Sequence, residues 1–203
     1  MSPRFCKPVT ARQRPTVRFV EAFSPKLNRR VRLLGRHAFE LWLLLESDPE
    51  VFAFCERPIH INDDQDVVDF WVRRDECERF LMIGDSKAGN THLSNYPDIE
   101  LRCVTLAELA ANHVWLRNWE RILPYINCCR GIPSPALQES ILRFIAEPTQ
   151  LSRVERHFST GDPSVVRAAL FGLLHAGRIQ SSDLRVQPLN SLTSFEPRRR
   201  QPS

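Results

Sequence analysis

The stretch Phe80–Lys87, written FLMIGDSK, constrains the fold more than any other part of the chain. Its apolar first half predicts a strand that is buried on both faces and is therefore central in a sheet. The stretch then ends in a carboxylate and a lysine, Asp85 and Lys87. Side chains two positions apart in a strand project from the same face, so this acid and this ammonium group are expected to lie side by side.

A second acid is expected beside Asp85. The stretch DVVDFWV, residues 66–72, predicts a strand that the acidic turn RRDECE joins to the next one in an antiparallel pair, and this pairing brings Asp69 near Asp85. Two close carboxylates repel each other unless a cation lies between them. Oxygen ligands of this kind suit Mg²⁺, with Mn²⁺ as the alternative, better than zinc. Lys87 can orient a water molecule or offset the charge of a phosphate.

A third acid, Glu40, lies in the apolar stretch RHAFELWLLLES, residues 36–47, which predicts a helix. Burying an unpaired glutamate is costly, so we expect Glu40 to contact a metal or a hydrogen-bonded partner. Taken singly, each acid has a structural explanation as a turn former or as half of a surface ion pair. Together, in the order helix, strand, strand, they favour a catalytic site.

The charge of the chain is unevenly distributed. Lys and Arg exceed Asp and Glu by four overall, yet residues 1–36 hold ten basic residues and one acid, and residues 37–78 hold twelve acids and three arginines. A basic arm beside an acidic block is typical of a protein that binds a polyanion, and a solvated basic tail is the alternative.

The chain is expected to contain two domains. A helix with strong periodicity is predicted from Thr105 to Ile126, and the sequence CRGIPSP marks a boundary at about residue 130. Three helices and two short strands follow, the order of a winged helix-turn-helix, which contacts DNA or proteins. The predicted segments are a basic arm with little structure at residues 1–27, a first domain at 28–130, a winged-helix-like domain at 134–195 and a basic tail at 196–203.

The composition indicates a cytoplasmic protein that does not contact a membrane. No apolar run reaches the roughly 18–20 residues that span a bilayer, and the first residues lack the apolar core of a signal peptide. Six cysteines without CxxC spacing fit a reducing compartment better than a disulfide framework or a zinc site.

The acids and the lysine resemble the pattern of the PD-(D/E)xK nuclease superfamily, here Glu40, Asp69 and Asp85-Ser86-Lys87. Over residues 28–195 the chain is similar to the TnsA-type endonuclease subunit of heteromeric transposases. The matching segments are ELWLLLESDPEVFAFCERPIHI, VVDFWV, TLAEL…LRNWERIL and VRAALFGLLHAGRIQSSDLRVQPLNSLTSF. The resemblance implies an α/β (α+β) restriction-endonuclease-like core with a mixed sheet, followed by a small winged-helix-like α-helical domain.

The resemblance also implies an activity, partners and roles for particular residues. The activity is that of a Mg²⁺-dependent endodeoxyribonuclease that hydrolyses one strand at each transposon end in bacterial cut-and-paste transposition, associated with the nucleoid when bound to DNA. Asp69, Asp85 and Glu40 would bind the metal, and Lys87 would position the attacking water. The partners would be DNA, an integrase-type transposase and an ATPase regulator. The candidates for DNA contacts are Arg36, Arg57, Arg153 and Arg167.

Two other functions remain open for the same fold. One is a stand-alone nuclease of the restriction or repair type, which would need its own surface for reading DNA sequence. The other is a non-catalytic adaptor that binds DNA or protein through a decayed site. The presence of Asp69, Asp85 and Lys87 argues for the enzyme.

Overall fold

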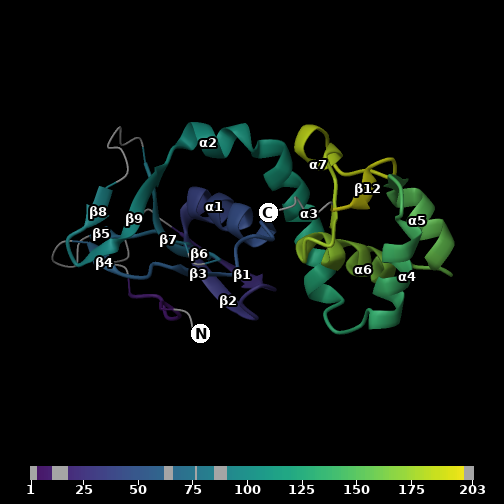
Figure 1. Ribbon diagram of the computed structural model, residues 1–203, viewed down its shortest axis with the longest axis horizontal. Helices are drawn as coiled ribbons and strands as arrows, with labels where there is room; N and C mark the ends of the chain where they lie inside the picture. Colours follow the sequence, from purple (N-terminus) through teal and green to yellow (C-terminus); the bar gives the residue numbers. More distant parts are fainter. Residues whose placement is uncertain (1–3, 11–17, 62–65, 76, 85–90, 199–203) are drawn as a thin grey trace. The chain divides into compact units, whose positions relative to one another are not determined.

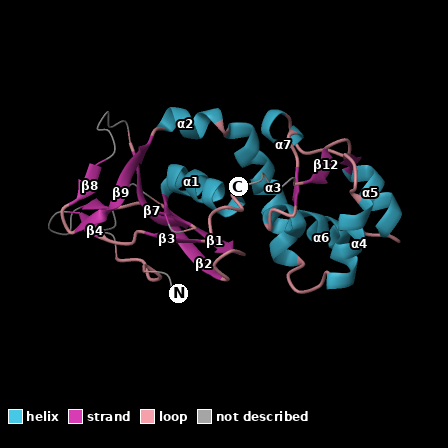
Figure 2. Ribbon diagram, in the orientation of Figure 1, coloured by secondary structure: helices cyan, strands magenta, loops and turns pink. Residues whose placement is uncertain are grey.

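A computed structural model of the protein, drawn in Figures 1 and 2, describes residues 4–10, 18–61, 66–75, 77–84 and 91–198. These residues form seven helices and twelve strands, so the fold is of mixed α/β type. None of the helices in these ranges is long and apolar enough to cross a membrane. The chain divides into two compact units, Met1–Ala111 and Asn112–Ser203.

The first unit is built on a five-stranded sheet with the strand order β3-β6-β7-β9-β8. Its strands are β3 (Ala53–Glu56), β6 (Phe70–Arg74), β7 (Cys77–Ile83), β8 (Thr91–Leu93) and β9 (Tyr96–Val104). Strand β7 runs antiparallel to β6 and parallel to β9, so the sheet is mixed, as predicted. Because β7 has a neighbour on each side, its predicted central position is confirmed.

A hairpin precedes this sheet in the chain. Strands β1 (Phe19–Ser24) and β2 (Arg29–Leu34) pair antiparallel, and helix α1 (Gly35–Ser47) follows directly, close to the predicted bounds. On β2 the buried residues Val31 and Leu33 alternate with exposed arginines. The prediction of an arm without structure up to residue 27 is therefore wrong for β1, because β2 supplies the apolar face on which the hairpin packs.

The residues that begin the described chain are also ordered against the first unit. The ring of Phe5 lies among those of Trp71, Phe80 and Tyr96, with centroid distances of 5.5, 5.6 and 5.6 Å. Residues 4–10, which we call the N-terminal strap, thus pack through one aromatic side chain on a buried cluster of the sheet. Burial of an aromatic ring gives a short peptide enough apolar contact to hold its position.

A polar cluster closes the C-terminal end of α1. The ammonium group of Lys26 donates hydrogen bonds to the carbonyls of Leu45 and Asp48, at 2.8 and 2.6 Å, as a cation does at a helix C-terminus. Burial lowers the pKa of Lys26 to about 8. The carboxylate of Glu46 is fully buried and accepts hydrogen bonds from the Ser24 hydroxyl and the Lys26 N–H. Glu46, and not Glu40, is thus the fully buried acid of α1.

The second unit combines helices with a small sheet. Its helices are α3 (His113–Cys128), α4 (Pro135–Phe144), α5 (Leu151–Phe158), α6 (Ser164–His175) and α7 (Asp183–Val186). Its strands, β10 (Thr149–Gln150), β11 (Ile179–Gln180) and β12 (Ser194–Pro197), form an antiparallel sheet in the order β10-β12-β11. The expected three helices α4, α5 and α6 are present, but only one of the two strands expected between residues 178 and 189 forms, and α7 replaces the other. The predicted tail beginning at residue 196 is shorter, since β12 extends to Pro197.

The units meet in sequence between Ala111 and Asn112, earlier than the predicted boundary at about residue 130. The helix predicted over residues 105–126 is in fact two helices, α2 (Leu106–Ala111) and α3. Helix α2 begins with the expected capping box, in which Thr105 and Glu108 exchange two side-chain to backbone hydrogen bonds of 3.1 Å. Helix α3 packs on α6 and α7, and the buried amide of Asn118 bonds the backbone around α7, so α3 belongs to the second unit.

Candidate functional site

The candidate site centres on Asp69, which lies where a strand pair is interrupted. The predicted strand over residues 66–72 is divided into β5 (Asp66–Val67) and β6, and Val68 and Asp69 stand between them. The facing segment of the same chain is interrupted likewise between β3 and β4 (His60–Ile61). There the N–H of Arg57 donates a hydrogen bond to the Asp69 carbonyl at 2.8 Å. Asp69 therefore lies at a break in the strand, directly before β6 begins.

The carboxylate of Asp69 reaches the end of the central strand. Its Oδ2 accepts a hydrogen bond from the backbone N–H of Ile83, the last residue of β7, at 2.7 Å. Asp85 and Lys87 follow Ile83 in sequence by two and four positions, but both lie outside the residues that the structure describes. The described chain leads up to them through Gly84, which donates to the carbonyl of Val104 and accepts a bond from the thiol of Cys103.

Burial dominates the chemistry of Asp69. It raises the pKa of this carboxyl to about 6, and the hydrogen bond from Ile83 lowers it only in part. Within the described chain no cationic side chain pairs with Asp69. A carboxylate in this state gains from a cation in its vicinity, because ionisation is otherwise opposed by the loss of water.

The third predicted acid, Glu40, has local partners. Its side chain, 20% exposed, accepts hydrogen bonds from Arg36 Nε at 2.8 Å and from His37 Nδ1 at 3.3 Å on the same helix. Burial raises the pKa of Glu40, but the bonds to Arg36 and His37 outweigh it and hold this pKa below its usual value. Of the two partners expected for Glu40, the structure provides the hydrogen-bonded one.

The described ranges contain no group of three or more His, Cys, Asp or Glu side chains placed to hold a metal. The predicted metal set of Glu40, Asp69 and Asp85 includes one residue outside those ranges. Of the other two, Asp69 is partly buried and pairs with no cationic side chain in the described ranges, whereas Glu40 pairs with Arg36 and His37.

Two of the four arginines predicted to contact DNA lie in the first unit. Arg36 is exposed, pairs with Glu40 and lies over the ring of Phe39. Arg57 is instead buried, only 9% exposed, and its guanidinium lies 5.4 Å from the centroid of the Phe19 ring. This burial is not visible in the sequence, since Arg57 stands beside Glu56, with which it could be expected to pair. Glu56 instead binds Arg29 through both carboxylate oxygens, at 2.7 and 2.6 Å.

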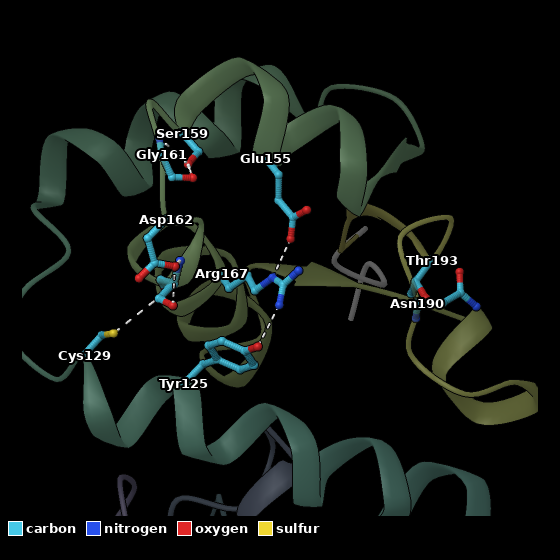
Figure 3. Close-up of polar contacts among 10 residues, drawn as sticks. Tyr125, Cys129, Glu155, Ser159, Gly161, Asp162, Arg167, Asn190 and Thr193 are labelled. Carbon is cyan, nitrogen blue, oxygen red and sulfur yellow. Dashed lines mark hydrogen bonds and ion pairs between the residues drawn. The ribbon is translucent and has the colours of Figure 1, made fainter.

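The other two predicted arginines lie in the second unit. Arg153 is exposed and lies over the ring of Phe144. Arg167 is held between two partners, as Figure 3 shows: its Nε donates to Glu155 and its Nη1 donates to the hydroxyl of Tyr125, at 2.5 and 2.7 Å. The bond to Glu155 chiefly raises the pKa of Arg167, so its charge is satisfied within the unit. A cavity of about 410 Å³ lies beside it, lined from α3, α5, α6 and residues 189–191.

The third of the predicted helices, α6, has little surface of its own. Seven of its twelve residues are buried, namely Val166, Ala168, Ala169, Leu170, Phe171, Leu173 and Leu174. Helices α3 and α4 both pack on it. A helix covered in this way cannot enter a DNA groove as a recognition helix does.

No family model matches the chain, and no curated protein matches it either. A function is therefore inferred from the residues and their geometry.

Proposed function

We propose that the protein is a Mg²⁺-dependent DNA endonuclease of the PD-(D/E)xK type that acts as a TnsA-like subunit of a heteromeric transposase. The observation that carries this proposal is the hydrogen bond from Ile83 to the partly buried carboxylate of Asp69. It ties the acid of one strand to the end of the strand that Asp85 and Lys87 follow. This arrangement is what the acid, acid-x-lysine pattern requires.

The order of elements around the site supports the same proposal. Helix α1 precedes the antiparallel strands β3, β6 and β7, and β9 then runs parallel to β7. We assign this order to a restriction-endonuclease-like core. In the second unit, α4, β10, α5, α6, β11 and β12 follow one another with the sheet order β10-β12-β11, which we assign to a winged-helix-like module.

The chemistry of Asp69 supports a magnesium site. Its carboxylate is partly buried, has a raised pKa and has no cationic partner in the described chain, and oxygen donors are those that Mg²⁺ prefers. Asp69 and Asp85 would hold the ion, with Glu40 as the third acid. When bound, the ion would polarise the scissile phosphate and offset the charge that develops on it.

The protein side chains would perform the remaining steps. Ile83 N–H fixes the orientation of Asp69, and Arg36 with His37 keeps Glu40 ionised. Lys87 would position the water that attacks the phosphorus in line, and its ammonium would stabilise the added negative charge of the transition state. Hydrolysis would break one P–O bond and leave a phosphate and a hydroxyl at the nick.

The second unit is better suited to a protein partner than to groove recognition, because α6 is buried and Arg167 is already paired. We propose that it contacts the transposase or the ATPase regulator.

A cleavage assay tests the enzyme directly. The full-length protein with its partner subunits should nick DNA that carries transposon ends in Mg²⁺ and not in EDTA. The variants Asp85→Ala and Lys87→Ala should lose this activity by at least about 100-fold while they keep their far-UV circular dichroism. Asp75→Asn is the matched control, since Asp75 is an exposed acid just beyond the opposite end of β6 from Asp69.

Two outcomes would contradict this proposal. If the assembled protein makes no metal-dependent nick, the adaptor function is the better explanation. If the protein alone cuts DNA without transposon ends as fast as DNA with them, a stand-alone nuclease is favoured.

A further inference from the structure

Arg57 lies next to the candidate site in a backbone conformation that costs energy. Its φ is +48°, in the left-handed region that non-glycine residues rarely adopt. Two backbone bonds hold it there: its N–H donates to the Asp69 carbonyl and its carbonyl accepts from Val9 N–H, both at 2.8 Å. Strain that the surroundings enforce in this way is a common property of binding and catalytic positions.

The side chain of Arg57 carries a charge that burial opposes and that the nearby Glu56 offsets only in part. Its Nε is buried and has no hydrogen-bond partner there. The nearest acid in sequence, Glu56, is bound through both of its oxygens by Arg29. Burial therefore lowers the pKa of the Arg57 guanidinium below its usual value. A buried cation without an anion is costly, and proteins seldom keep one without a use.

A second guanidinium lies close to the first. Arg57 and Arg32 both approach the ring of Phe19, with their guanidinium carbons 5.4 and 4.6 Å from its centroid. Arg32 repels Arg57, which adds to the lowering of the Arg57 pKa. The side chain of Arg32 is 58% exposed and pairs with Glu21 at 3.1 Å, so this second guanidinium is accessible to solvent. Two like charges on one aromatic ring favour an anion between or beside them.

We propose that Arg57, Arg32 and Phe19 form a binding site for a backbone phosphate of the DNA strand that enters the candidate nuclease site. The choice of DNA as the source of this phosphate rests on the proposed function. Guanidinium groups match the geometry of phosphate oxygens and bind them through paired hydrogen bonds. Because Arg57 is bonded to the backbone of Asp69, a phosphate held here lies in the strand near that acid. Arg57 is a positioning residue, since it touches DNA but not the bond that is cut.

A purely structural role for Arg57 makes a different prediction. If the guanidinium were needed for packing, its replacement would lower stability. If it is instead an uncompensated charge kept for an anion, replacement by a neutral residue of similar length leaves stability unchanged or raises it, while phosphate binding weakens.

The experiment measures DNA binding by fluorescence anisotropy with the full-length protein and a labelled duplex in EDTA, so that no cleavage contributes. The variants are Arg57→Gln and Arg32→Gln. Arg74→Gln is the matched control, because Arg74 is an exposed arginine at the far end of β6. We expect Arg57→Gln to weaken binding about tenfold and to reduce the slope of log affinity against log salt by about one. Arg32→Gln should weaken it about threefold, and Arg74→Gln less than twofold.

Thermal unfolding gives the second readout. Arg57→Gln should melt at the temperature of the unsubstituted protein or above it, and 10 mM pyrophosphate should raise the melting temperature of the unsubstituted protein but not of Arg57→Gln. Unchanged DNA affinity in Arg57→Gln overturns the proposal, as does a fall in its melting temperature or an absence of DNA binding by the unsubstituted protein at low salt. The proposal is also overturned if pyrophosphate, at the same concentration as the duplex, displaces the duplex from the protein. That result would indicate a site for small anions. A protein that passes these tests but never cuts DNA keeps the phosphate site and loses the nuclease function.

Discussion

Arg57 in the first unit is buried and Arg167 in the second is partly buried, and the surroundings of the two differ. Arg167 is bonded to Glu155 and Tyr125, and its charge is satisfied. Arg57 lies beside a glutamate that is bonded to another arginine, and its Nε has no partner in the described chain. Complete polar networks make a fold rigid, whereas an unsatisfied buried group beside a strained backbone calls for an explanation. The difference is why we propose the first unit, and not the second, as the place where an anion and a metal bind.

Asp69 extends this comparison, because it is a partly buried acid of the first unit that has no cationic partner among the described residues. Asp69→Asn should reduce cleavage by at least about 100-fold, since a metal ligand is lost while the hydrogen bond from Ile83 can be kept. Mg²⁺ should raise the melting temperature of the unsubstituted protein and leave that of Asp69→Asn unchanged. Retained Mg²⁺-dependent stabilisation in Asp69→Asn would show that the metal binds elsewhere.

The same substitution should stabilise the fold in a pH-dependent way. Asp69 has a pKa of about 6 in the folded protein and an ordinary value near 3.8 when unfolded. Between these values the folded state binds more protons, so the contribution of Asp69 to the free energy of unfolding falls as the pH rises from about 4 to about 6. Urea unfolding of both proteins should give equal stabilities near pH 4 and an advantage for Asp69→Asn of about 2 kcal/mol at pH 7. An advantage that is the same at both pH values would contradict this origin.

The second unit should respond in the opposite sense. Glu155→Gln removes the charged partner of Arg167 and should lower the free energy of unfolding by about 1–2 kcal/mol without changing DNA affinity. Glu139→Gln is the control, because Glu139 is an exposed acid whose arginine partners are 3.5 and 3.9 Å away, and it should change stability by less than about 0.5 kcal/mol. Weaker DNA binding by Glu155→Gln would place part of the DNA surface in the second unit.

The sequence predicted those features that depend on local pattern. The apolar run that begins at Phe80 indicated the central strand, the apolar stretch of residues 36–47 indicated α1, and Thr105 with Glu108 indicated a capping box, all of which the structure confirms. Each of these depends on residues close together in the chain, where strand alternation and helix periodicity apply.

Features set by distant residues were not predicted. Nothing in the stretch DVVDFWV shows that the strand breaks at Asp69, because the break arises from the facing residues around Arg57. Arg57 is buried without Glu56 as a hydrogen-bonded partner, because Arg29, from another strand, binds the Glu56 carboxylate. The boundary at Ala111 follows from the packing of α3 on α6 and α7. Local composition carries no information about such partners.

The N-terminal strap has a consequence for the order of events during synthesis. Arg4 pairs with Asp98, 94 positions later in the chain, and Phe5 packs on rings that include Tyr96. Ribosomes add about 5–20 residues per second, so the strap leaves the ribosome several seconds before β9 does. The aromatic cluster around Trp71 and Phe80 therefore completes its cover only after β9 has been made, and the strap, although synthesised before β9, is among the last parts of this unit to reach its partners.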